Sequence, residues 1–163
     1  MSRMQGQSPH EKYMRRAIAK ARAGIAGGQT PFGACVVRDG AVISAAHNTV
    51  WRDCDITSHA EVAAIRKACR KLGTVDLSGC TVYTTCEPCP MCFSACHWAR
   101  VSAVVYGADI ADAQAAGFNE LTIPALTMKL IGGSGVAVTG GVLRNENREL
   151  FREWRKAKKS KTY

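Results

Sequence analysis

The segment TTCEPCPMCFSACHWAR, which begins at Thr84, constrains this chain more than any other part of the sequence. It places four cysteines close together, at Cys86, Cys89, Cys92 and Cys96. The segment follows a short apolar run typical of a strand, and its own composition favours a helix that opens at a proline. Positions three and four apart share one face of a helix, so the last three cysteines should project from the same side. We therefore expect thiols gathered for a metal ion.

Two metals fit this spacing. The pattern C-x2-C-x2-C-x3-C is that of bacterial iron–sulfur cluster runs, and such a cluster on all four cysteines is one alternative. A second element favours the other alternative, zinc, because His59-Ala60-Glu61 also stands at the start of an expected helix. One imidazole and two thiolates are ligands that zinc accepts while keeping a fourth position for water. We predict zinc on His59, Cys89 and Cys92.

Glu61 is the predicted acid/base of the site, because it follows the histidine by two residues and is not needed as a ligand. Zinc lowers the pKa of a bound water to about 7, and a neighbouring carboxylate can then carry its protons. The backbone N–H groups near Ala60 and Cys89 are further candidates for binding substrate. The alternative for Glu61 is structural, since Ser58 and Glu61 also have the spacing of a helix capping box.

The rest of the chain alternates between helical and strand patterns. Helices are expected at 10–23, 57–73, 88–100, 109–118 and 145–159, and strands at 80–85 and 101–108, with a hairpin that turns at Asp39-Gly40. The glycine-rich stretch 126–142 predicts a short helix followed by a strand. Alternating strands and helices predict an α/β fold with helices on both faces of the sheet. Because the sequence contains no repeat and no linker, we expect one domain over 1–163.

The net charge of +9 is concentrated at the two ends of the chain. Residues 1–22 hold six basic residues and one acidic residue, residues 144–163 hold eight and three, and the middle is nearly neutral. A basic surface can meet nucleic acid, but solvated amphipathic helices explain the pattern more simply, so a nucleic-acid partner is not expected. Neither a membrane span nor the apolar run of a secretory signal is apparent, which predicts a cytoplasmic protein.

The two motifs together match the signature H-x-E…P-C-x-x-C of zinc deaminases. Over residues 14–118 and again in the tail, the chain resembles the cytidine deaminase superfamily, and within it the bacterial guanine deaminases. The phrases that carry the resemblance are PFGACVVRDG, HAEVAAIRKACRKLG, YTTCEPCPMC, WAR and DAQAAGF. The resemblance implies a three-layer αβα fold with a mixed sheet of about five strands. It also implies zinc-dependent hydrolysis of guanine to xanthine and ammonia.

The same resemblance implies roles for five further residues. Phe32 and Trp98 match aromatic residues that sandwich the purine ring, and Asn48 matches an asparagine that binds the base edge. Asp112 matches an acidic residue that contacts the nitrogen edge of the substrate. Tyr163 matches a tyrosine that, in this family, reaches the site of a neighbouring subunit in a domain-swapped dimer. The chain is thus expected to form a homodimer, in which 144–163 is the segment that could be exchanged.

Several alternatives stay open at the level of sequence. Residues 121–143 depart from the guanine deaminase pattern, which leaves both the exchange of the tail and the substrate undecided. Guanosine, cytosine or an aminated triazine could replace guanine as the substrate. The relatives that act on tRNA adenosine share both metal motifs, so RNA editing is a second alternative. The third is a metal-stabilised binding module without enzymatic activity.

Overall fold

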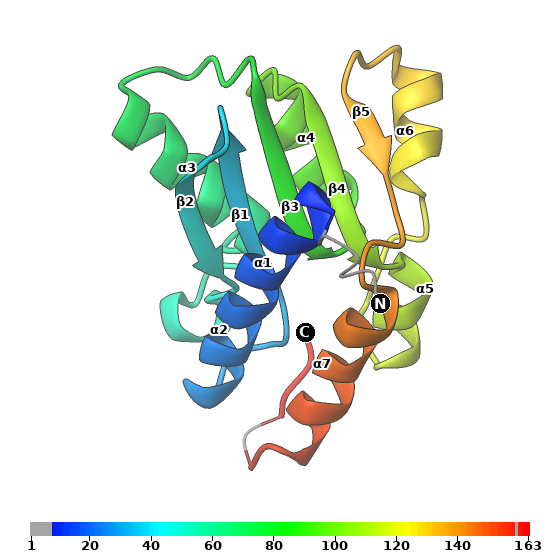
Figure 1. Ribbon diagram of the computed structural model, residues 1–163. Coiled ribbons are helices and arrows are strands. Elements are labelled where there is room, and N and C mark those ends of the chain that lie inside the picture. Colours follow the sequence, from blue (N-terminus) through cyan, green and yellow to red (C-terminus); the bar gives the residue numbers. More distant parts are fainter. Residues whose placement is uncertain (1–7, 159) are drawn as a thin grey trace, which may run out of the picture.

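The computed structural model describes residues 8–158 and 160–163 of the chain. Its elements, labelled in Figure 1, are α1 (Pro9–Ala26), β1 (Gly33–Arg38), β2 (Ala41–His47), α2 (Val50–Asp53), α3 (Ala60–Leu72), β3 (Cys80–Cys86), α4 (Pro90–Trp98), β4 (Ala103–Ala108), α5 (Ile110–Ala115), α6 (Ala125–Gly132), β5 (Ala137–Thr139) and α7 (Arg144–Lys156). The first seven residues, part of the stretch in which no export signal is expected, lie outside this description.

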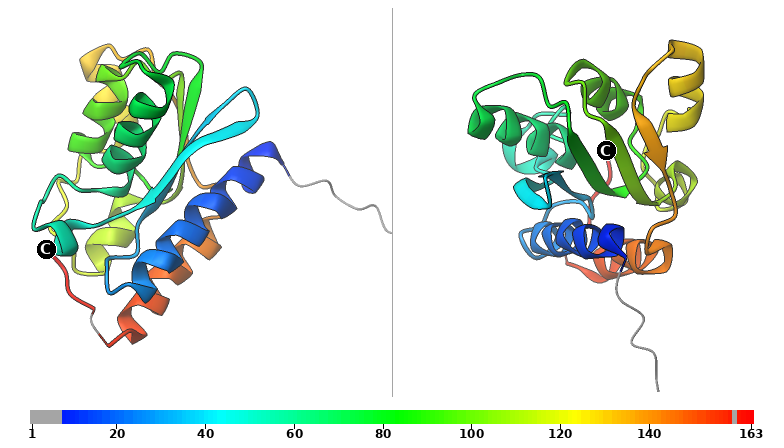
Figure 2. Two further views of the ribbon diagram at one scale, coloured as in Figure 1. Left: turned by 90° about the vertical axis from the view of Figure 1, so that its left-hand side faces the viewer. Right: turned by 45° about the horizontal axis from the view of Figure 1, so that its top comes forward.

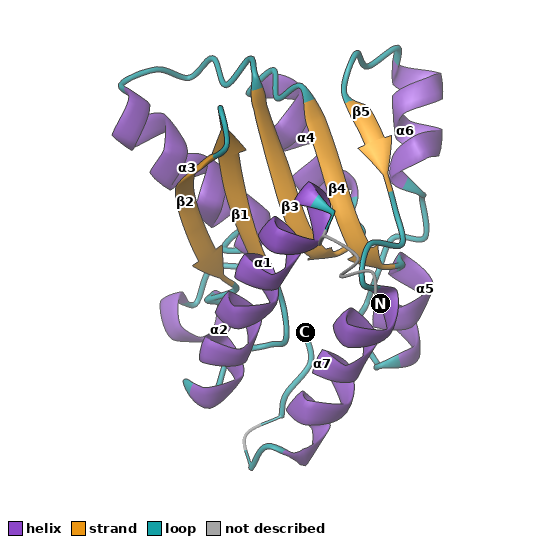
Figure 3. Ribbon diagram, viewed as in Figure 1, coloured by secondary structure: helices purple, strands orange, loops and turns teal. Residues whose placement is uncertain are grey.

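The strands form one five-stranded sheet in the order β2-β1-β3-β4-β5. The strand β1 pairs antiparallel with both β2 and β3, whereas β3, β4 and β5 run parallel to one another. Figure 3 shows the sheet with helices in front of it and behind it. The expected mixed sheet of about five strands in an αβα arrangement is therefore confirmed.

Helices cover both faces of the sheet. The helices α1 and α7 contact each other and lie on one face, where Met14, Ile18 and Leu150 are buried against the strands. The helices α3, α4 and α6 cover the other face, with Phe93 and Leu77 in the larger core cluster. Figure 2 shows the two layers from the side. The starts of α3 and α4 consequently lie on the same side of the sheet.

The packing of α1 on the sheet depends on a glycine at the start of β1. A β-carbon placed on Gly33 would lie 2.2 Å from the carbonyl oxygen of Ala17 and 2.5 Å from the backbone nitrogen of Ala21. Only a residue without a side chain permits this approach of helix to strand. Gly33 thus sets the distance between α1 and β1.

The predicted hairpin joins β1 and β2. Asp39 and Gly40 have φ angles of 50° and 75°, so both residues adopt the left-handed conformation. A two-residue turn of this kind matches the twist of the paired strands, which is why Asp-Gly favours it. The hairpin places β2 at the edge of the sheet.

Two local features differ from the expectations. The helix α1 continues past Ala23 to Ala26 and ends at Gly27. The short helix α2 has no periodic signal in the sequence and was not expected. The stretch 126–142 forms the predicted short helix and strand, α6 and β5. Within the described residues, no helix combines the length and apolar character needed to cross a membrane.

Candidate active site

His59, Cys89 and Cys92 converge on one point. Their nitrogen and sulfur ligand atoms all lie within 4.8 Å of one another. His59 Nδ1 is 3.7 Å from Cys89 Sγ and 3.5 Å from Cys92 Sγ. Zinc bonds of about 2.0 Å to nitrogen and about 2.3 Å to sulfur at tetrahedral angles place these atoms about 3.5 Å apart. The donor set and its dimensions therefore fit zinc.

The ends of two neighbouring helices position these ligands. His59 is the N-cap of α3 and Cys89 is the N-cap of α4, and both have extended backbone angles. Cys92 lies in the first turn of α4, on the same side as Cys89. The first N–H groups of a helix carry partial positive charge, which favours the thiolate form of cysteine. Pro90 suits the opening of α4 because that position needs no N–H donor.

The two thiols differ sharply in acidity. A hydrogen bond from Cys92 lowers the pKa of Cys89 to about 4, and the nearby His59 adds to this effect against burial. The same hydrogen bond and burial raise the pKa of Cys92 well above its ordinary value. Without a metal, the proton of the pair thus stays on Cys92 and not on Cys89. A metal ion that binds both sulfurs displaces this proton.

Glu61 is buried in the first turn of α3, with 6% of its surface exposed. Thr84, on β3, donates a hydrogen bond of 2.8 Å to Glu61 Oε1, and the Cys92 thiol lies 3.4 Å from Oε2. Burial raises the pKa of Glu61, while the His59 ring and the Thr84 hydroxyl counteract the rise. A carboxylate with a raised pKa beside a metal site is suited to proton transfer.

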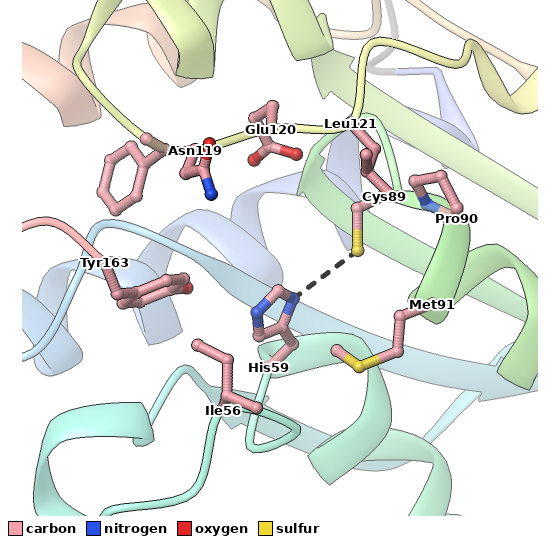
Figure 4. Close-up of a pocket in the computed structure, with 10 residues that line it drawn as sticks. Ile56, His59, Cys89, Pro90, Met91, Asn119, Glu120, Leu121 and Tyr163 are labelled. Carbon is pink, nitrogen blue, oxygen red and sulfur yellow. Dashed lines mark hydrogen bonds between the residues drawn. The ribbon is translucent and has the colours of Figure 1, made fainter.

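A cavity of about 240 Å³ opens directly onto the ligands. Figure 4 shows its lining side chains pointing into a common space, with Cys89 and His59 at one end and Tyr163 and Glu120 beside them. The mouth is largely apolar: Ile56, Met91 and Leu121 line it. The cavity is small, but it has the mixture of apolar walls and few polar groups that small-molecule sites have.

Tyr163 lines this cavity within its own chain, whereas the resemblance implied that it reaches the site of a neighbouring subunit. Its ring centre lies 5.6 Å from that of His59 and 5.5 Å from that of Phe118. The Asn48 side-chain amide donates a hydrogen bond of 2.7 Å to the Tyr163 hydroxyl, and Asn48 Oδ1 accepts one from the backbone of Val50. Asn48 is fully buried. It lies behind Tyr163, so its contact with the cavity passes through the tyrosine.

Phe32 lines a narrow inner extension of the cavity, together with Glu61 and Glu120. Its ring packs edge-on against Phe118 at 4.9 Å and Phe151 at 5.8 Å. Ala60 is fully buried as the first residue of α3. It lies between His59 and Glu61 but is not among the residues that line either part of the cavity. Of these two predicted residues, only Phe32 lines the site.

Trp98 does not line either cavity, contrary to the expectation that it sandwiches the substrate. It is the last residue of α4, two turns away from the ligands, and 83% of its side chain is exposed. Because α4 is nine residues long, Trp98 at its last position lies far from the metal ligands at its start, although it follows them closely in sequence. Within one chain, Trp98 is a surface residue.

Asp112 is also absent from the cavity. Its side chain accepts a hydrogen bond from the Asp109 N–H in a capping box at the start of α5. It further pairs with Arg144 at 3.4 Å and Arg148 at 3.1 Å, both on α7. The helix cap and two cations from a distant helix account for this carboxylate, so the predicted substrate contact is not supported.

Glu120 is the site residue that the sequence did not single out. It lines both parts of the cavity, and burial raises its pKa to about 7, with the negative Cys89 nearby adding to the rise. It follows α5 in a loop without regular structure, next to Phe118 and Asn119. The signal that could have found it is an acidic residue at the end of the phrase AAGFNE, just beyond the segment quoted for the resemblance.

Cys86 and Cys96 lie apart from the ligand group. Cys86 is buried at the end of β3, with its thiol 3.5 Å from the Asp109 carbonyl oxygen. Cys96 is fully buried in the larger core cluster. Among the described residues, His59, Cys89 and Cys92 are the only group of three or more potential ligands brought together. Two cysteines of the run are thus packed thiols.

A mixed sheet with a His-Cys-Cys site at two helix starts, and a buried glutamate beside it, defines a zinc-dependent hydrolase. The comparison with known families agrees, because residues 7–108 match the cytidine and deoxycytidylate deaminase zinc-binding region. The chain belongs to this family of zinc deaminases. The expectations of family, enzyme class and zinc are therefore confirmed.

Known relatives include two kinds of deaminase. The guanine deaminase of Bacillus subtilis (strain 168) is 51% identical over 112 residues, which cover 68% of this chain and 72% of the relative. The tRNA-specific adenosine deaminase of the same organism is 38% identical over 154 residues, covering 92% and 93%. Among solved structures, the guanine deaminase from Nitrosomonas europaea is 36% identical with a TM-score of 0.82, covering 88% of this chain and 83% of that one.

Proposed function

We propose that the protein is a guanine deaminase, which hydrolyses guanine to xanthine and ammonia. One observation carries the proposal: an acidic side chain, Glu120, and a tyrosine hydroxyl flank a small apolar cavity that ends at the metal ligands. Such a cavity suits a flat base with a polar edge. The 51% identity to a guanine deaminase supports the same substrate.

The chain's own residues supply the proton transfers. Zinc held by His59, Cys89 and Cys92 would supply an activated water and positive charge beside the reacting carbon. Glu61 accepts a proton from the attacking water and delivers it to the ring nitrogen next to C2 of guanine. It then takes the remaining proton of the hydroxyl added to C2 and passes it to the amino group, which leaves as ammonia. The Thr84 hydroxyl holds the carboxylate in place for these transfers.

We assign to Glu120 the recognition of the base edge that the family resemblance implied for Asp112. Guanine presents N–H donors along its ring edge, and a carboxylate accepts hydrogen bonds from them. Phe32 and Phe118 provide the apolar walls of the cavity. Tyr163, held by Asn48, forms the wall of the cavity next to the ligand His59.

The test is ammonia release from guanine, guanosine, cytosine and adenine by the zinc-loaded protein. We expect turnover of guanine alone, and none in the Glu61→Gln variant. Release from cytosine or guanosine but not from guanine would contradict the substrate while keeping the enzyme class. No release from any compound of the panel, by protein with full zinc content, would contradict both.

A tRNA adenosine deaminase is the second candidate, because the relative of that name matches nearly the whole chain. It requires inosine formation in a tRNA anticodon stem–loop and binding that weakens steeply with salt. The Tyr163 ring lies close to the ligand His59, so an RNA strand would have to displace Tyr163 to enter the site. This arrangement favours a free base as the substrate.

We also propose that the protein is a homodimer. Exposed apolar side chains support this, since Trp98, Leu130 and Ile131 are 83%, 70% and 84% exposed near the joined ends of α4 and α6. His97 and Ser134 link these two ends by a hydrogen bond of 3.0 Å. Light scattering of the native protein and of Trp98→Glu tests the dimer; a native monomer contradicts it. The cytoplasmic location stays a prediction.

Exchange of the tail between subunits is tested by mixing two inactive variants. One carries Glu61→Gln with an intact tail, and the other lacks residues 160–163 but keeps Glu61. If the tail is exchanged, co-refolding restores activity, because an intact Glu61 site receives an intact tail. We expect no recovery, since Tyr163 can reach Asn48 of its own chain.

A further inference from the structure

A second cavity, of about 290 Å³, lies at the β2 edge of the sheet, outside the active site. Thr49 and Ser58 form part of its wall, and their backbones are joined by a hydrogen bond of 3.0 Å. The cavity is a groove between helices on opposite faces of the sheet: α1 on one side and α3 on the other. The left view in Figure 2 shows the β1–β2 hairpin between these helices.

The groove is lined by six basic residues, Lys20, His47, Arg52, Arg66, Lys67 and Arg70. Three of them lie on one side of α3, because Arg66 and Lys67 are four and three positions before Arg70. Lys20 comes from α1, so cations approach the groove from both of its walls. Like charges at this helical spacing repel one another, which makes the cluster unfavourable without a partner.

Four cations of this groove, Lys20 and the three on α3, have no acidic partner among the described residues, whereas several cations on neighbouring helices have one. On α7, Arg144 and Arg148 pair with acidic residues of α5, and on α1, Arg22 pairs with Glu153. In contrast, no carboxylate of the described residues lies within 4.0 Å of a cationic nitrogen of Lys20 or of the three α3 cations of the groove.

The acidic groups near the groove are already engaged. Asp53 pairs with Arg52 at 2.8 Å and accepts a hydrogen bond from Thr49. Asp55, which faces Arg66 more distantly, accepts hydrogen bonds from Thr57 and Ser58. Arg66 and Lys67 have only long contacts, of 3.5 Å and 3.4 Å, to neutral oxygen atoms. The groove therefore carries positive charge that its own walls do not neutralise.

We propose that this groove binds a small ligand that carries two or more phosphate groups, such as a nucleoside diphosphate. Arginine and lysine together suit phosphate, arginine through paired N–H donors and lysine as a point charge. The ligand is compact, because the basic residues line a single cavity of about 290 Å³ between α1 and α3.

Isothermal titration calorimetry on the zinc-loaded protein at low ionic strength tests the proposal. The probes are inorganic pyrophosphate, guanosine diphosphate and a short oligouridylate. Pyrophosphate carries no base, so its binding does not depend on guanine recognition or on deaminase activity. We expect saturable binding of pyrophosphate and guanosine diphosphate, with zinc content unchanged after the titration.

Two variants provide the comparison. Arg70→Ala should weaken pyrophosphate binding by roughly tenfold, as expected for the loss of one charge-assisted contact. The matched control Arg152→Ala removes a surface arginine that pairs with Glu149 on α7, and it should leave binding unchanged. Arg70→Ala should not lower the midpoint of thermal unfolding, because it relieves repulsion between cations.

Three results would overturn the proposal. These are absence of pyrophosphate binding, equal weakening by Arg70→Ala and Arg152→Ala, and tighter binding of oligouridylate than of both small phosphates. The last result would identify the groove as part of a nucleic-acid surface. None of them bears on guanine deamination, which is measured separately by ammonia release.

Discussion

Thr84 Oγ1 lies 2.8 Å from Glu61 Oε1 and donates a hydrogen bond to it within the buried centre of the protein. The two residues come from the middle of the sheet and from the first turn of α3, and they meet only because α3 packs across the strands. The bond favours the charged form of Glu61 and opposes the rise in pKa that burial causes. Thr84 is therefore a positioning residue for the predicted acid/base.

Thr84→Val should lower kcat and move the acidic limb of the pH profile of kcat/KM to higher pH. Loss of a hydrogen bond to the carboxylate raises the pKa of Glu61 further, so a higher pH is needed to reach its basic form. A Thr84→Val enzyme with an unshifted pH profile contradicts the positioning role. Thr84→Ser keeps the hydroxyl, so its pH profile should match that of the native enzyme.

Glu61→Gln should reduce kcat by about 10²- to 10⁴-fold at full zinc content.

Substitution of a zinc ligand should abolish zinc binding while the protein stays folded. Cys89→Ser and His59→Ala are expected to lose bound zinc and activity, as measured by elemental analysis after dialysis. Cys96→Ala is the matched control, because Cys96 is packed in the core and lies outside the ligand group. If Cys96→Ala also loses metal, or if the purified protein contains iron, the four-cysteine cluster is the correct alternative.

The hydroxyl of Tyr163 should contribute to substrate affinity through Asn48. In Tyr163→Phe, the ring contacts remain but the buried Asn48 amide loses its acceptor, a penalty of about 1–3 kcal/mol. We expect KM for guanine to rise about tenfold while kcat changes less. Tyr83→Phe is a control that removes a hydroxyl bonded to His10 on the α1 side of the sheet. Equal effects of both substitutions would indicate a general loss of stability.

Glu120→Gln should impair recognition of guanine more than catalysis. The substitution keeps the shape of the side chain but removes the negative charge that accepts hydrogen bonds from the base, which is worth about 1.5–3 kcal/mol. Steady-state kinetics should show a KM for guanine raised by a factor of about ten or more. Asp112→Asn, by contrast, should leave KM unchanged and only weaken the contact between α5 and α7. A KM for guanine that rises in Asp112→Asn but not in Glu120→Gln would instead support the substrate contact first predicted for Asp112.

Gly33→Ala should be among the most destabilising single-methyl substitutions in this chain. The new β-carbon would lie 2.2 Å from a backbone oxygen of α1, so the helix must move away from the sheet. Overpacking of this kind costs about 1–3 kcal/mol. Gly132→Ala is the control, since nothing lies within 4 Å of its β-carbon position and an alanine favours the helix. Urea unfolding that ranks the two variants equally would contradict this account.

The local motifs were sufficient to predict the ligands and the fold class. His59 and Cys89 each stand at a helix start, and the conformation of a helix start depends on neighbouring residues in the chain. The hairpin at Asp39-Gly40 is local in the same sense. These features could be predicted because short-range sequence determines both the backbone conformation and the residue types available to the metal.

Tertiary structure decided what surrounds the metal. Glu120 reaches the cavity because the loop after α5 crosses over the starts of α3 and α4, which no periodic pattern encodes. Asp112 is drawn away by two arginines of α7, more than thirty positions later in the chain. The cations on α3 are likewise left without an acidic partner because of contacts that form only when the chain folds. Local sequence thus determines which residues can bind the metal. Long-range packing determines which other residues surround it, because contacts between distant segments exist only in the folded chain.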